Sequence, residues 1–147
     1  MKALLYAGIL LIVVVLVSGC TVAPASAPTT GTATQNTPDI TGNWTGTMTG
    51  YAAGKGFTDY AGYVMTMRVT EQEGRIFHGN FTFSNGNGFV KTVEFSGATG
   101  RDGTTLTIAE CGGGYSFGTL VAPDEIELIH ADDGEPSDVA IDTLKKV

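Results

Sequence analysis

The chain has 147 residues and carries 15 Asp and Glu against 8 Lys and Arg, which gives a formal net charge of −7. A chain this acidic is not expected to bind nucleic acid or an anionic lipid surface through charge. Nucleic acid is therefore excluded as an expected partner. Residues 39–147 have the length of one ordinary domain.

The first twenty residues are typical of an export signal. Lys2 supplies a positive charge, and residues 3–17 form a nearly unbroken apolar run. This run is shorter than the roughly 20 apolar residues that a membrane-spanning helix needs. We therefore interpret residues 1–19 as a signal peptide. The alternative is an uncleaved N-terminal anchor.

The end of this segment, LVSGC at residues 16–20, resembles the lipobox of prokaryotic lipoproteins, in which small residues precede a cysteine that is lipidated and becomes the new N-terminus. Ser18 and Gly19 match the two small positions, and Val17 stands where leucine is more usual. The resemblance implies that Cys20 carries lipid. It also implies anchoring to the cell membrane on its extracytoplasmic face.

Residues 20–38 contain this cysteine and an uncharged segment rich in Thr and Pro. Such a segment cannot bury enough apolar surface to fold, so we expect a disordered linker that acts as a spacer. A stalk of this kind after a lipobox is similar to envelope lipoproteins of methanogenic archaea, and bacterial lipoproteins carry it too. With lipid on Cys20, Cys111 has no disulfide partner. We expect Cys111 to be a small buried residue at a strand end.

The rest of the chain alternates apolar and polar residues with a period of two, which indicates half-buried strands. Turn-forming Gly, Asn, Asp and Pro separate these runs. The pattern predicts an all-β domain over residues 39–147, a single antiparallel up-and-down barrel of about eight strands, with a small sandwich as the alternative. The expected strands lie within residues 39–50, 63–69, 76–83, 89–97, 105–110, 115–121, 125–130 and 138–144.

The opening run, ITGNWTGTM, resembles the first strand of lipocalin and avidin-like (calycin-type) barrels. In those barrels a Gly-x-Trp step places the indole across the closed end, and Gly42 and Trp44 match this step. Lipocalins pack an arginine over the tryptophan, where this chain offers Lys145 or Lys146. The polar cluster that holds biotin in avidin-like proteins is missing, so biotin is not an implied ligand.

The alternation also predicts which side chains face inward. In the last expected strand, Val139 and Ile141 form the expected apolar face. A crowded interior favours a filled core, whereas an eight-stranded barrel can also enclose one small molecule, with residues 50–62 as a lid. The large side chains expected to fill the interior are Trp44, Met65, Met67, Phe77, Phe81, Phe83, Val93, Phe95, Tyr115 and Phe117.

Three functions remain open on this basis. The first is a binding or interaction role at the cell surface, with a small apolar ligand or a cell-surface partner of unknown identity. The second is a purely structural envelope domain with a filled core. The third is a hydrolase or a metal-dependent enzyme. The size of the internal cavity discriminates between the first two.

The acidic segment 123–138 and its neighbour His130 are the places to look for chemistry. Asp132, Asp133 and Glu135 could hold calcium through carboxylate oxygens, but their spacing lacks the pattern of an EF-hand. We interpret the segment as a solvated acidic hairpin turn. His130 has no nucleophile motif beside it. We therefore expect no catalytic residues, no metal, no cofactor and no enzymatic activity.

Two Asn-x-Thr sequons complete the motifs, NWT at Asn43 and NFT at Asn80. Since Trp44 and Phe81 are expected to face inward, alternation turns both asparagines outward. In an exported protein these are candidate N-glycosylation sites.

Overall fold

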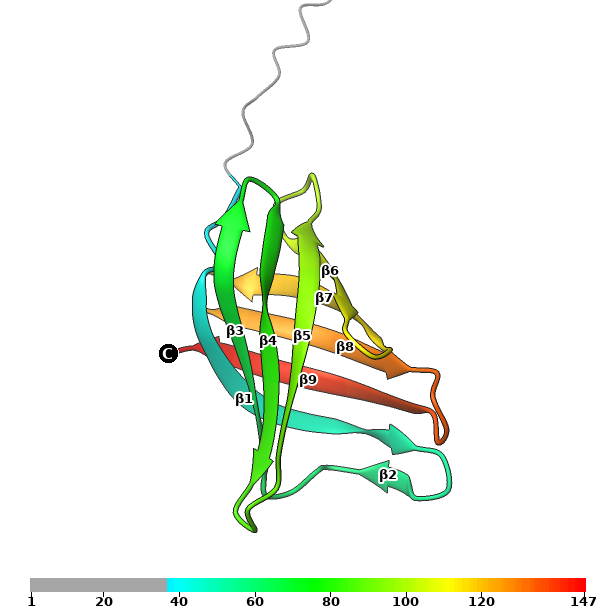
Figure 1. Cartoon of the computed structure of the whole chain (residues 1–147). Helices are drawn as coiled ribbons and strands as arrows, with labels where there is room; N and C mark the ends of the chain where they lie inside the picture. Colours follow the sequence, from blue (N-terminus) through cyan, green and yellow to red (C-terminus); the bar gives the residue numbers. More distant parts are fainter. Residues whose placement is uncertain (1–36) are drawn as a thin grey trace, which may run out of the picture. The chain divides into compact units, whose positions relative to one another are not determined.

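The computed structural model describes residues 37–147, in which all regular elements are β-strands (Figure 1). The predicted signal peptide, Cys20 and all but the last two residues of the predicted linker lie outside the described residues. The strands are β1 (Gly42–Ala52), β2 (Gly56–Thr58), β3 (Tyr63–Glu73), β4 (Ile76–Asn85), β5 (Val90–Thr99), β6 (Thr105–Glu110), β7 (Tyr115–Ala122), β8 (Glu125–Asp132) and β9 (Asp138–Lys146).

Eight of these strands form a closed antiparallel barrel. Each strand from β3 to β9 pairs with the next along the chain, and β1 pairs with both β3 and β9, which closes the sheet. This meander confirms the predicted up-and-down barrel and replaces the sandwich alternative. The short strand β2 is an addition that pairs only with the end of β1. The nine described strands and the core cluster all lie within residues 40–147.

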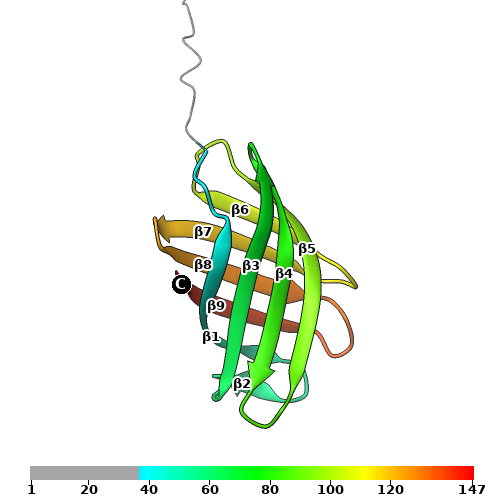
Figure 2. The same ribbon diagram turned by 60° about the vertical axis from the view of Figure 1, so that its left-hand side comes forward.

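β1 determines the shape of the wall, because it changes neighbours along its length. Residues 42–46 pair with β3, whereas residues 44–52 pair with β9, so the second half of β1 leaves β3 (Figure 2). Gly46 marks the point of divergence, and a Cβ atom there would lie 1.8 Å from the carbonyl oxygen of Thr143. Only glycine therefore allows β1 and β9 to approach so closely at this point.

The end of the barrel at which the described chain begins is filled. Trp44 is fully buried there, and its Nε1 donates a hydrogen bond to the carbonyl oxygen of Ile40 at 2.9 Å. The Lys146 ammonium lies 5.1 Å from the centroid of the indole, within the range of a cation–π interaction. The backbone N–H of Ile40 donates to Gln72 Oε1, which holds the entering chain across this closed end.

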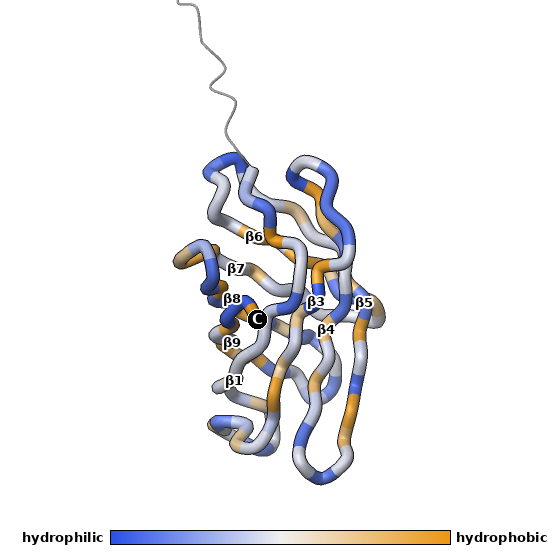
Figure 3. Tube along the Cα trace, turned by 90° about the vertical axis from the view of Figure 1, so that its left-hand side faces the viewer, coloured by the Kyte–Doolittle hydropathy of each residue, from blue (hydrophilic) through white to orange (hydrophobic). Residues whose placement is uncertain are grey.

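In the middle strands, the side chains that face the interior are the predicted ones. Apolar residues alternate with polar ones along β3 and β4 (Figure 3). Phe77, Phe81 and Phe95 are buried and pack against one another. Gly97 makes room for this cluster, since a Cβ atom there would lie 2.4 Å from the Phe77 ring.

The prediction of which side chains of β7 and β9 face inward is wrong. Tyr115 and Phe117 are 57% and 53% exposed on the outer wall, and Val139 and Ile141 also face outward. The closed end explains the difference, because Leu144 of β9 is fully buried beside Trp44 in the core. Placing Leu144 inside turns every second residue of β9 inward with it. Leu120 of β7 packs against the same core. Its phase turns Ser116 and Gly118 inward.

The core predicts a large difference between two neighbouring residues of β4. Phe81→Ala is expected to lower the free energy of unfolding by roughly 3 kcal/mol or more, as a truncation of a fully buried ring. Asn80→Asp, on the outer face, should change it by no more than about 0.5 kcal/mol. Urea denaturation of both variants of the barrel domain measures the difference. A larger loss for Asn80→Asp would contradict the inward phase of β4.

Candidate functional site at the open end of the barrel

The end of the barrel opposite Trp44 is hollow. It holds a cavity of about 880 Å³, which lies within the usual range for small-molecule sites. The cavity is bounded by the far ends of β1 and β9 on one side and by β3 to β5 on the other, where β1 and β3 have diverged. Its lining includes Met48, Ala52, Tyr60, Tyr63, Phe83, Phe89, Val93, Glu110, His130, Asp138 and Ala140.

The cavity exists because small residues occupy the inward positions around it. Ala52 and Ala140 face inward from β1 and β9, and Gly112 and Gly113 form the adjoining β6–β7 turn. The large residues Tyr115 and Phe117, which were expected to fill this space, lie on the outer wall. The filled interior is therefore confined to the closed half of the barrel.

Residues 50–62, the expected lid, form one side of the mouth. The segment contains β2, and Phe57 to Ala61 line the cavity. Tyr60 has a left-handed backbone with φ of 46° and packs against the core. Its ring meets that of Tyr63 edge-on, and Tyr63 in turn meets Phe89. These aromatic rings give this side of the cavity an apolar wall.

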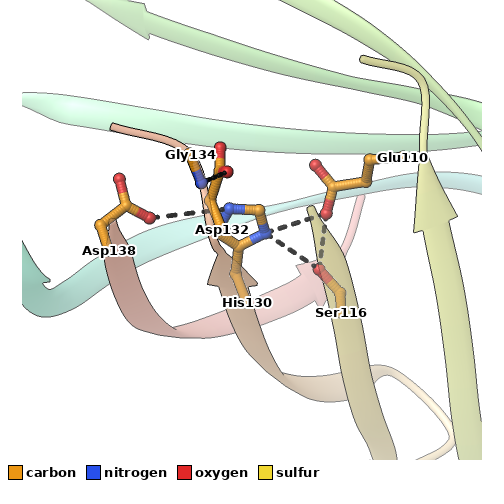
Figure 4. Close-up of polar contacts among 6 residues, drawn as sticks. All are labelled: Glu110, Ser116, His130, Asp132, Gly134 and Asp138. Carbon is orange, nitrogen blue, oxygen red and sulfur yellow. Dashed lines mark hydrogen bonds and ion pairs between the residues drawn. The ribbon is translucent and has the colours of Figure 1, made fainter. Parts of the chain in front are cut away.

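The opposite wall carries a polar cluster from four strands (Figure 4). His130 Nδ1 lies 2.9 Å from Glu110 Oε1, and the Ser116 hydroxyl donates to the same oxygen at 2.8 Å. His130 Nε2 lies 3.8 Å from Asp138 Oδ1 on the other side of the ring. The imidazole thus stands between two carboxylates. Glu110 is almost fully buried, with 4% of its side chain exposed.

This cluster contains a serine, a histidine and a carboxylate, but its geometry is not that of an activated nucleophile. Ser116 is fully buried, so its hydroxyl is inaccessible to a substrate. The hydroxyl donates to Glu110, and its distance to His130 Nδ1 is longer, at 3.4 Å. In a nucleophile–base pair the hydroxyl would instead donate to the imidazole. The arrangement holds His130 in place beside the cavity.

The surroundings raise the pKa of His130 in this cluster and of the neighbouring Asp142. The hydrogen bond with Glu110 raises the pKa of His130; burial opposes this, and the negative charges of Glu110, Asp138 and Asp142 add to the rise. Burial raises the pKa of Asp142 to about 7, assisted by the charges of Glu110 and Asp138 and opposed by His130. Near neutral pH, the Asp142 carboxyl is therefore partly protonated.

Sequence reasoning missed Glu110, Ser116, Asp138 and Asp142 as site residues. For Glu110 a signal was present, since it continues the inward phase of Leu106 and Ile108 in β6, as His130 continues the inward phase of β8. Because the side chains of a strand alternate between its two faces, Glu110 and His130 both face the barrel interior at the same end. β7 and β9 carry large apolar residues on their outer faces, so the sequence pattern predicts that these residues face inward. It therefore gives no sign that Ser116 and Asp142 do so.

The other predicted positions lie elsewhere on the barrel. Asn43 is exposed and Asn80 is half-buried, with Phe81 beside it facing inward. Their glycosylation remains a prediction. Cys111 was expected to be buried, and this is wrong. It is exposed in the glycine-rich β6–β7 turn, where the strand has ended and no core remains to cover it.

The acidic segment forms the β8–β9 hairpin turn, in which Gly134 N–H donates to Asp132 Oδ1. Within residues 37–147, no three His, Cys, Asp or Glu side chains come together in a way that could hold a metal ion. The same part of the chain has no helix of the length and apolarity needed to cross a membrane.

No protein-family model and no curated protein matches the sequence. Among solved structures, EF1p2_mFAP2b bound to DFHBI has a TM-score of 0.55 and 12% identity, over 74% of this chain and 94% of that chain. A redesigned β-barrel has a TM-score of 0.48 and 13% identity, over 74% and 91%. Zebrafish ileal bile acid-binding protein complexed with cholic acid has a TM-score of 0.40 and 18% identity, over 73% and 98%. At these identities the likeness concerns the fold alone, and the TM-score of the first supports the barrel architecture.

The titration of the cluster predicts that the barrel loses stability as the pH rises. The Asp142 pKa is about 7 in the folded protein against an ordinary 3.8, so between these values the folded state binds more protons and the free energy of unfolding falls as pH rises. The raised pKa of His130 acts in the same direction. Its stabilisation is complete below the ordinary value of 6.5 and is lost as pH rises through the folded pKa.

At about 1.4 kcal/mol per pH unit, we expect Asp142 alone to remove about 3 kcal/mol between about pH 5 and pH 8. Urea denaturation across this range measures the slope. Asp142→Asn should flatten it, because the amide does not titrate. A variant with the full slope of the unaltered protein would show that another group is responsible.

Proposed function

We propose that this chain is a lipid-anchored extracytoplasmic β-barrel that binds a small, largely apolar molecule in the cavity at its open end. The observation that carries the proposal is the cavity itself, of about 880 Å³. It combines an apolar wall of Tyr63, Phe83 and Phe89 with a few polar groups around His130. That combination is typical of small-molecule sites. A barrel of related architecture carries the small molecule DFHBI, and there the likeness extends to the fold alone.

Binding without turnover fits the polar cluster better than catalysis does. The Ser116 hydroxyl is inaccessible and points its proton at Glu110. The same groups suit a binding site, in which a few fixed polar side chains orient a ligand. A purely structural role would leave the small inward residues Ala52 and Ala140 unexplained, since larger side chains there would fill the cavity and add apolar burial.

The anchor belongs to the same proposal. The resemblance of LVSGC to a lipobox supports lipid on Cys20, and residues 21–38 would then serve as a spacer between lipid and barrel. The described chain enters the barrel at the closed end, where Ile40 packs with Trp44. The mouth of the cavity lies at the opposite end of the barrel.

The neutral fluorescent dye Nile red tests the cavity. We expect it to bind the barrel domain, and Ala140→Phe to weaken binding at least about tenfold by filling the cavity. Ile141→Phe is the matched control, because the adjacent residue of β9 faces outward. Fluorescence titration gives both affinities, with melting curves to show that each variant folds. Equal affinities in the two variants would mean that the dye binds elsewhere and that the cavity is not the site.

Metabolic labelling with a lipid precursor tests the anchor. The unaltered chain should be labelled, and Cys20→Ser should abolish the label and release the protein from the membrane fraction. Cys111→Ser should keep the label, since Cys111 lies in an exposed turn of the barrel. Label retained in Cys20→Ser would refute lipidation at this residue.

A further inference from the structure

A buried carboxyl without a partner lies at the boundary between the cavity and the core. Asp142 is 1% exposed, and within residues 37–147 neither of its oxygens has a hydrogen-bond partner. Of the two other buried polar residues in this part of the chain, Ser116 is bonded to Glu110, whereas the Thr99 hydroxyl also lacks a partner but carries no charge. Buried polar groups are nearly always hydrogen-bonded, so Asp142 is an exception that calls for a physical reason.

The position of Asp142 connects it to the cavity. In the inward phase of β9 it follows Ala140, which lines the cavity, and precedes Leu144, which is part of the core. Its cross-strand neighbours are Met48 of β1 and Leu128 of β8. Met48 also lines the cavity, and its unbranched thioether side chain can adjust to a ligand. A group at the bottom of the cavity would therefore come next to Asp142.

Charges around the cavity specify what that group can be. Four carboxyls line it, from Asp59, Glu110, Asp132 and Asp138, against the lysines Lys55 and Lys91 and the already paired His130, while Asp142 lies buried just beyond this lining. Both lysines are exposed at the mouth. Among the described residues, the charges that act on Asp142 are the carboxylates of Glu110 and Asp138 and the paired His130, so the potential at this depth of the cavity is negative. An anionic head group would be repelled there, whereas a positive one would supply the partner that Asp142 lacks.

We propose that the ligand of this cavity is an organic cation. Its ammonium group lies beside Asp142, and its apolar body lies against Met48, Tyr63 and Phe83. The inference rests on the proposed function, because it specifies the class of ligand in the same cavity. A metal ion fits less well, since the described residues hold no cluster of three metal-ligating side chains. An alkylammonium ion needs one carboxylate and an apolar wall. The cavity lining supplies the wall, and Asp142, whose cross-strand neighbour Met48 lines the cavity, supplies the carboxylate.

Three probes of equal chain length test the charge preference: octylammonium chloride, 1-octanol and sodium octanoate. Isothermal titration calorimetry of the barrel domain near pH 8 is expected to show octylammonium binding at least about tenfold tighter than octanol, with octanoate weaker than both. Asp142→Asn should weaken octylammonium binding about tenfold and leave octanol unchanged. Asp133→Asn, an exposed carboxylate of the β8–β9 turn outside the cavity lining, is the matched control and should change octylammonium binding less than about threefold.

A second measurement needs no variant. Octylammonium affinity should rise between about pH 5 and pH 8 as Asp142 loses its proton, while octanol affinity stays constant. The titratable groups that face Asp142 are Glu110 of β6, His130 of β8, Asp138 of β9 and Tyr60 of the β2–β3 connection. Of these, His130 has a raised pKa and loses its positive charge as pH rises through it, which favours the cation further.

The outcomes separate this inference from the proposed function. Equal affinities for octylammonium and octanol, or an unchanged octylammonium affinity in Asp142→Asn, would overturn the cation preference while leaving a small-molecule site in place. A loss in Asp133→Asn in place of Asp142→Asn would show that the overall charge of the acidic turn attracts the cation, and would overturn the assignment to Asp142. No binding of any probe, together with no Nile red binding, would overturn the proposed function itself.

Discussion

The structure depends on the ladder between β1 and β9, which closes the sheet into a barrel. Nine residue pairs join these strands, from Trp44 with Lys146 to Ala52 with Asp138. The same strand β1 must also reach β3, and it does so only over residues 42–46. One end of the barrel is therefore closed on both sides of β1 and filled around Trp44. At the other end β1 has left β3, and the wall opens into the cavity.

Closure also decides which side chains face the cavity. Because the side chains of a strand alternate between faces, burying Leu144 beside Trp44 forces Asp142 and Ala140 inward further along β9. The residues that would have made an apolar lining, Val139 and Ile141, consequently face outward. The small and polar side chains that β9 directs into the open half are thus a consequence of how the closed half packs. The strand register that packs the closed half therefore also determines which side chains face the cavity.

The sequence predicted the barrel because alternation is strong in β3 to β6, where one face is apolar and the other polar. It failed for β7 and β9, in which both phases carry apolar residues, so that periodicity alone cannot choose between them. Phe117 and Ile141 then looked like core, and Ser116 and Asp142 like surface. The contact between His130 and Glu110 joins residues 20 positions apart, and only the pairing of strands through β7 brings them together.

Asp142 links the stability of the barrel to its occupancy. An ionised carboxyl without a partner destabilises the folded state, since burial disfavours its charge. Replacing it by an apolar residue of similar size would remove this cost, so its presence is not explained by folding. A positive ligand that pairs with the carboxylate would reduce the same cost and stabilise the folded state in proportion to its affinity and concentration. Without such a ligand, Asp142 lowers the stability of the folded barrel, and a cationic ligand would offset that loss. A residue that costs stability in this way is expected where a binding site conflicts with optimal packing.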